Sequence, residues 1–139
     1  MSSSTMRRAL NIGLWVVQLL LMAVFVLTGF VKVFQPIGVL AETYRWIGVA
    51  PPLFVRFVGI CELLAAAGLL GPAALCVMPR LTVFAAMGII LLMVGAIVTH
   101  VLLGPWSTII VNLMLLSLAA FVAYGRSMLV PVQPRAGCG

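Results

Sequence analysis

Acidic residues are almost absent from this chain. Its 139 residues include no aspartate and two glutamates, Glu42 and Glu62. Only 7% of the residues are charged, whereas about a quarter are charged in an ordinary soluble domain. So few charges cannot cover the surface of a soluble protein of this size, so that class is excluded. The hydrophobic content of 65% and the mean hydropathy of +1.32 indicate an integral membrane protein.

The sequence also lacks the motifs of common cofactor sites. It has one histidine, His100, no nucleotide-binding loop, and no ligand set at haem or metal spacing. Cys61, Cys76 and Cys138 form no Cys-x-x-Cys pair, which disfavours a dithiol redox site and favours packing roles. We therefore predict no metal site, and redox chemistry would need a mobile quinone or a cofactor held by a partner.

Long apolar runs dominate what is present. They predict four membrane spans at about residues 10–34, 52–70, 81–102 and 106–124. Short connections between such spans predict an all-α fold, an antiparallel four-helix transmembrane bundle forming a single domain over residues 1–139. The basic N-terminus resembles the start of a signal peptide, but the apolar run continues without a small-residue cleavage site. We expect this first span to be uncleaved.

A less hydrophobic segment separates the first two predicted spans. Apolar residues recur there at helical spacing from Ile37 to Ile47, which predicts a short amphipathic helix lying in the membrane interface. Such a helix would cover one end of the bundle.

The basic residues indicate the orientation of the spans. The net charge of +6 comes from residues scattered at the ends of apolar runs, a pattern of membrane topology and not of nucleic-acid binding. Five basic residues flank one side and three flank the other, namely Arg7, Arg8, Arg80, Arg126 and Arg135 against Lys32, Arg45 and Arg56. This excess predicts a multi-pass protein of the inner (plasma) membrane with both termini in the cytoplasm.

Glu62 is the most informative residue. Counted from Pro51-Pro52, it lies roughly 15 Å along its helix, near the middle of a bilayer core of about 30 Å. Placing an ionised carboxylate there costs about 2.5–3.5 kcal/mol on insertion scales, so Glu62 needs a proton, a partner or a water-filled cavity. We therefore favour a functional role for it.

Other polar residues gather in the outer half of the predicted bundle. Side chains lean toward the N-terminus of their own helix, so Lys32 and His100 should point toward the level of Glu62 and Asn112. We therefore expect catalytic roles for Glu62, His100 and Lys32. The expected ligand-binding residues are Thr28, Asn112, Trp106 and Thr108.

Each of these residues also has a simpler interpretation. Lys32 could extend its amine to the lipid headgroups, and Arg56 reads as an interfacial anchor on a different helical face from Glu62. His100 could be a hydrogen-bonded boundary residue, and Asn112 could join helices. Two glycines on one face, Gly88 and Gly95, suggest a packing seam.

Three segments in order resemble the DoxX-like family of small four-span membrane proteins, over roughly residues 10–125. They are Gly29-Phe30-Val31-Lys32, Gly59-Ile60-Cys61-Glu62-Leu63 leading into Gly68-Leu69-Leu70-Gly71-Pro72, and Ala96-Ile97-Val98-Thr99-His100. The resemblance carries over Lys32, Glu62 and His100. It implies a link to thiosulfate:quinone oxidoreduction, or to membrane oxidoreductase complexes that handle thiol stress. More distant similarity extends to bundles that bind or isomerise sterol-like lipids.

These observations leave three hypotheses open. In the first, a polar pocket binds a small amphipathic molecule, most plausibly a quinone, as part of an oxidoreductase assembly. In the second, the chain is a lipid-binding or assembly module with a structural ion pair. In the third, it is a cofactor-free isomerase that uses proton transfer by Glu62 and His100. The expected partners are membrane lipids, the ligand, an oxidoreductase and a second copy of the chain, and not nucleic acid.

Overall fold

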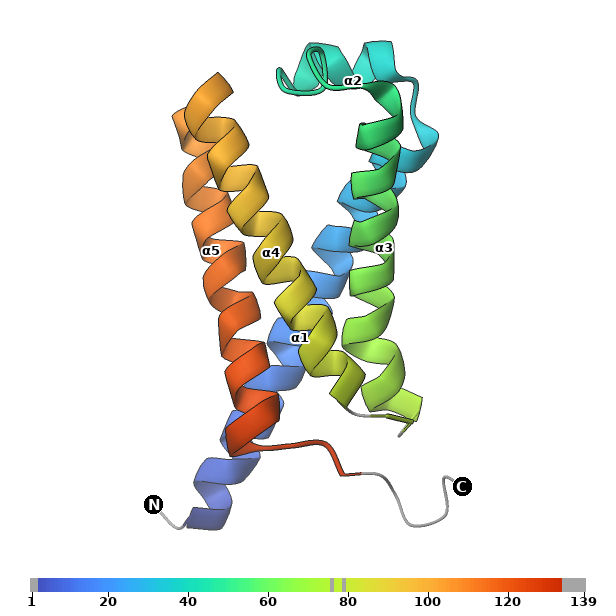
Figure 1. Cartoon of the computed structure of the whole chain (residues 1–139). Coiled ribbons are helices and arrows are strands. Elements are labelled where there is room, and N and C mark those ends of the chain that lie inside the picture. Colours follow the sequence, from blue (N-terminus) through green and yellow to red (C-terminus); the bar gives the residue numbers. More distant parts are fainter. Residues whose placement is uncertain (1–2, 76, 79, 134–139) are drawn as a thin grey trace.

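The computed structural model describes residues 3–75, 77–78 and 80–133, and these residues form helices and no strand. The helices are α1 (Ser3–Phe34), α2 (Ile37–Thr43), α3 (Pro52–Leu75), α4 (Arg80–Leu103), α5 (Trp106–Tyr124) and a short π-helix, η1 (Gly125–Leu129) (Figure 1). Four segments are long and apolar enough to cross a membrane, because η1 extends α5 to Leu129. The prediction of four apolar spans is confirmed.

Some boundaries differ from the predicted ones. The second span was expected to end before Gly71-Pro72, but α3 continues to Leu75 with Pro72 inside the helix. Tight packing of Gly68 against α4 holds this part of α3 in place, since a Cβ atom on Gly68 would lie 2.8 Å from the Ala85 Cβ. Membrane helices tolerate proline where neighbouring groups satisfy the freed backbone.

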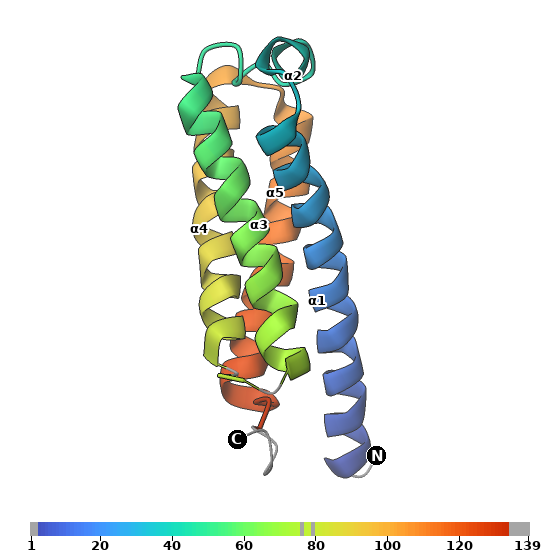
Figure 2. The same cartoon turned by 90° about the vertical axis from the view of Figure 1, so that its right-hand side faces the viewer.

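The helix between the first two spans is shorter than predicted. It ends at Thr43 and not at Ile47, because Tyr44 adopts an extended backbone with φ −117° and ψ 102°. Buried Leu40 and Ile47 pack against Val55 of α3, which fixes both this helix and the turn after it. Figures 1 and 2 show α2 across the end of the molecule opposite the N-terminus.

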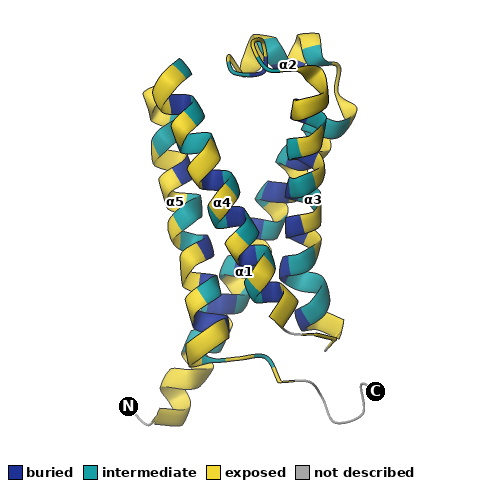
Figure 3. Ribbon diagram, in the orientation of Figure 1, coloured by how far each residue is buried: buried dark blue, intermediate teal, exposed yellow. Residues whose placement is uncertain are grey.

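The long helices pack as neighbours in a bundle. Contacts join α1 to α3, α3 to α4, and α4 to α5. Buried residues face the interior, whereas exposed residues cover the outer surfaces (Figure 3). Large apolar side chains are among the most exposed, including Leu27 at 67%, Leu91 at 74% and Leu102 at 76%. Such surfaces suit contact with lipid and not with water.

Close backbone contact occurs where α1 crosses α3. A Cβ atom on Gly29 would lie 2.8 Å from the carbonyl oxygen of Gly59, closer than real Cβ atoms approach other atoms. The packing seam therefore lies between α1 and α3. Gly88 and Gly95 form no such seam within the described part of the chain, because a Cβ atom on either glycine would meet nothing within 4 Å.

Candidate binding site inside the helical bundle

An ion pair links α1 to α3 near the end of the bundle that α2 covers. Lys32 Nζ lies 2.6 Å from Glu62 Oε1 and 2.8 Å from Oε2. The pair is largely buried, with the Lys32 side chain 12% exposed and that of Glu62 6% exposed. The structure thus brings Lys32 to Glu62, toward whose level its side chain was expected to point.

The backbone around this pair explains the short contact. Gly29 and Gly59 each precede their charged residue by about one helical turn, and the missing side chains let the two helices approach closely. Arg56 adds a second link between the helices, because its Nη1 donates to the Lys32 carbonyl oxygen over 2.6 Å. The interpretation of Arg56 as an anchor in the interface therefore omits its main contact.

A second polar pair lies on α4 and α5. His100 Nδ1 is 2.7 Å from the Ala96 carbonyl oxygen, and Asn112 Nδ2 is 3.2 Å from the same ring nitrogen. A carbonyl can only accept, so the shorter contact places a proton on Nδ1. With the proton on Nδ1, the Asn112 amide pairs with this N–H when it turns its oxygen, and not its nitrogen, toward the ring. In the neutral ring, Nε2 remains as an acceptor.

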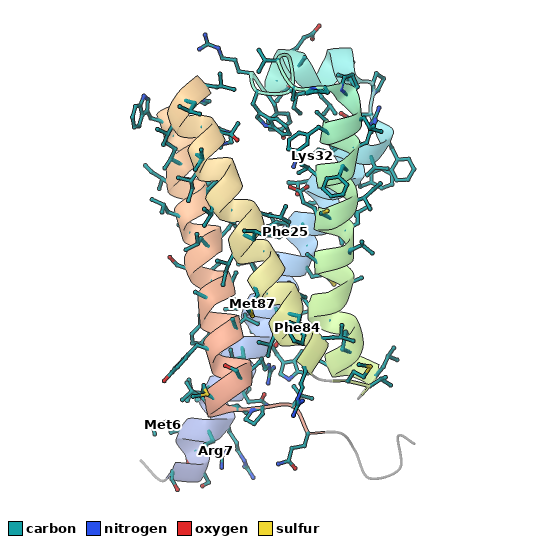
Figure 4. All side chains as sticks on the ribbon, in the orientation of Figure 1. Met6, Arg7, Phe25, Lys32, Phe84 and Met87 are labelled. Atoms are coloured by element: carbon teal, nitrogen blue, oxygen red, sulfur yellow. The ribbon has the colours of Figure 1, made fainter. Side chains whose placement is uncertain are left out.

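Both polar pairs line one cavity of about 440 Å³. Most of its wall is apolar and includes Phe25, Val58, Leu92 and Leu115. Lys32 lies toward the α2 end of the molecule, and Phe25 lies nearer the N-terminal end of α1 (Figure 4). Cavities that bind small molecules are typically apolar with a few placed polar groups, and their volumes run from about 300 to 1,000 Å³.

A model of the DoxX-like family matches residues 16–122, which is most of the chain. The chain belongs to the DoxX-like family. Together with its four apolar helices, this match makes it a multi-pass membrane protein. Searches of curated proteins and of solved structures found no match.

The predicted site residues of this DoxX-like protein mostly meet at the cavity. Its lining includes six of them, namely Lys32, Glu62, His100, Thr28, Thr108 and Asn112. Trp106 does not line it. That residue begins α5 and is 73% exposed, so it lies on the outer surface of the bundle.

The lining also includes polar-edged aromatic residues that were not predicted as site residues. Tyr44 and Trp46 follow α2 and line the same cavity. The sequence contained one indication of this role, because both residues lie in the segment predicted to be amphipathic and to cover one end of the bundle. The segment after α2 therefore contributes to the cavity wall.

Sequence reasoning also missed a second buried polar cluster of this DoxX-like protein. Arg126 of η1 donates from Nε to Gln18 Oε1 over 2.6 Å, and Gln18 Nε2 donates to the Leu69 carbonyl oxygen over 2.7 Å. Arg126 is only 4% exposed, so it does not simply mark the cytoplasmic end of a span as the sequence suggested; it packs inside the bundle. The signal in the sequence was Gln18, a polar residue within the first apolar run.

The described residues contain no group of three or more His, Cys, Asp or Glu side chains that could hold a metal ion. Cys61 is a free, half-buried thiol on α3. The other two cysteines, Cys76 and Cys138, lie outside the described residues.

Proposed function

We propose that this DoxX-like protein binds a small amphipathic molecule in the cavity between the ion pair and the His100–Asn112 pair. The observation that carries this proposal is the combination of apolar walls with two separate polar pairs around one space of about 440 Å³. Lys32 and Glu62 come from α1 and α3, whereas His100 and Asn112 come from α4 and α5. A ligand with polar atoms at two edges of an apolar body matches this arrangement.

A quinone is the ligand we favour. Its ring is flat and apolar, and its two oxygens lie at opposite edges, so each could meet one polar pair. Reduction of a quinone to a quinol takes two electrons, which an oxidoreductase partner would supply, and two protons. Glu62 and His100 would exchange protons with the two oxygens, and Lys32 would stabilise negative charge on Glu62 or on the near oxygen. The protein would thus be the quinone-interacting subunit of a membrane oxidoreductase system.

The proposal includes a placement in the membrane. The four spans form an antiparallel bundle in the inner (plasma) membrane, with both termini in the cytoplasm and α2 in the outer interface. This placement follows from the excess of basic residues on the side that carries Arg7 and Arg8. The cavity then lies in the outer half of the bilayer, on the side of the molecule that carries α2.

One observation favours a second candidate, a lipid-binding or assembly module. Both oxygens of Glu62 contact Lys32, and Arg56 donates a hydrogen bond to the Lys32 carbonyl oxygen. These contacts would hold α1 and α3 together even in a protein with no chemistry of its own. In that case the cavity holds a lipid chain, and the ion pair is structural.

Identification of the molecules that co-purify tests the proposal. The protein is purified in a mild detergent, extracted with organic solvent, and analysed by mass spectrometry against membranes that lack it. A quinone present in near one-to-one ratio supports the proposal. Phospholipid alone contradicts it and favours the assembly module, and an enriched apolar metabolite without quinone contradicts it in favour of an isomerase.

A further inference from the structure

The buried cluster around Arg126 lies apart from the cavity described above. Arg126 Nη1 donates to Asn11 Oδ1 over 2.8 Å, and its guanidinium carbon lies 5.1 Å from the centre of the Trp15 ring. Its third nitrogen, Nη2, is buried and has no hydrogen-bond partner within the described part of the chain. A guanidinium offers five N–H donors, so this cation is incompletely satisfied.

Neutral groups supply all the hydrogen bonds that Arg126 is seen to make. Asn11, Gln18 and the Val130 carbonyl oxygen accept them, and none carries a negative charge. The acidic side chains of the sequence are Glu42, on α2, and Glu62, which already pairs with Lys32. A buried cation without a counterion is unfavourable, so a negative charge from another molecule would stabilise it.

A second cavity, of about 740 Å³, adjoins this cation. Arg126 and the exposed Arg80 line it, together with Ser127 and an apolar set formed by Met78, Val83, Phe84, Pro131 and Val132. Phe84 lies toward the end of the molecule opposite Lys32, the end at which the chain begins (Figure 4). The cavity therefore combines two cations with an apolar wall at one end of the bundle.

We infer that this second cavity binds the phosphate headgroup of an anionic phospholipid, held by Arg126 and Arg80. Arginine binds phosphate oxygens through paired N–H donors. Nη2 is buried, so the Arg126 side chain would have to turn toward the cavity for this nitrogen to donate to a phosphate oxygen. Basic pockets between membrane helices are suited to anionic headgroups. The apolar wall and the volume favour a lipid over free phosphate, because a water molecule occupies only about 30 Å³ in the liquid and a small anion is not many times larger.

Native mass spectrometry of the delipidated full chain tests this inference. The probes are a phosphatidylglycerol, the diacylglycerol with the same acyl chains, and inorganic phosphate. We expect the phosphatidylglycerol to bind at least about tenfold more tightly than the diacylglycerol, because one charge-assisted hydrogen bond changes affinity by about that factor. Equal binding of the two lipids would overturn the inference. Inorganic phosphate that displaces the phosphatidylglycerol at similar concentrations would show that the source is a free anion and would overturn the assignment to lipid.

Variants separate this cavity from general attraction between basic residues and acidic lipids. Arg80→Gln removes an exposed cation of the cavity without touching the Arg126 cluster, so the fold should persist. It should weaken phosphatidylglycerol binding about five- to tenfold. The matched control is Arg8→Gln, which removes an exposed charge from the same end of the molecule outside the cavity and should change affinity by less than about twofold. Equal losses in both variants would contradict a defined site.

Discussion

Gly59 of α3 lies so close to Lys32 of α1 that a Cβ atom at position 59 would come within 2.8 Å of the Lys32 Cβ. The same contact brings Gly29 against the Gly59 carbonyl oxygen. Because the helices meet here, Lys32 Nζ reaches both oxygens of Glu62. Glycine packing and the ion pair are therefore one arrangement, in which the first sets the distance for the second.

Substitution of Gly59 should disturb both. In Gly59→Ala the new methyl group would overlap backbone of α1 and the base of Lys32, so the helices must separate. We expect a loss of about 1–3 kcal/mol in the free energy of unfolding, the usual range for overpacking. Gly88→Ala is the matched control, since nothing lies within 4 Å of its Cβ position. It should be neutral or stabilise the helix by up to about 1 kcal/mol. Equal effects of the two variants on thermal unfolding in detergent would contradict the close contact.

The ion pair should show strong coupling in a double-mutant cycle. Lys32→Met and Glu62→Gln each leave a buried partner without its contact, so each should destabilise the protein by about 3–5 kcal/mol. The double variant should lose clearly less than the sum, because no uncompensated charge remains. Thermal unfolding in detergent measures all four proteins. Additive losses would show that the two residues act independently.

The fold was largely predictable from the sequence because hydrophobic run length determines membrane spans directly. The ends of the helices were harder to predict. Pro72 is a signal for the end of a helix, but α3 continues to Leu75 because Gly68 packs against α4. A proline signal is local, whereas the contact that overrides it is tertiary. The end of α2 at Thr43 likewise depends on how Leu40 and Ile47 pack against Val55.

Site residues could be predicted where burying a charge inside the membrane is energetically costly. Glu62 required a partner at its depth, and Lys32 was the cation within reach. Trp106 was misplaced because an aromatic residue at the start of a span signals the interface without indicating which way it faces. Arg126 was missed for a related reason, since a basic residue after an apolar run is usually a topological signal. Its burial depends on Gln18 and Asn11, which are more than a hundred residues away in the sequence.

Gln18 should be essential to the stability of the cluster at the opposite end of the bundle. In Gln18→Leu, Arg126 Nε loses its acceptor and the Leu69 carbonyl oxygen loses a donor. Buried groups left unsatisfied cost about 1–3 kcal/mol each, so a loss of at least about 2 kcal/mol is expected. The control is Gln35→Leu at an exposed position between α1 and α2. A fall in the melting temperature no larger than that of this control would contradict a structural role for the cluster.

The proposed orientation can be tested by labelling single cysteines in intact cells. The chain with Cys61 and Cys76 replaced keeps Cys138, which lies outside the described residues and should react only after the membrane is permeabilised. A second chain, with all native cysteines replaced and Glu42→Cys added on α2, should react from the outside. An impermeant maleimide distinguishes the two sides. Reaction of Cys138 in intact cells would reverse the orientation and place the cavity in the inner half of the membrane.

An amphipathic molecule of the quinone type is the ligand that we propose for the cavity between the two polar pairs. Trp46 lines this cavity, so a chain with Trp15→Phe and Trp106→Phe reports on it through a single fluorophore. We predict saturable quenching of Trp46 fluorescence by a short-chain quinone in detergent. Asn112→Leu should weaken binding about tenfold, whereas Ser117→Ala, an exposed residue of the same helix, should leave it unchanged. Quenching that rises linearly without saturation, and equally in all three proteins, would contradict the claim.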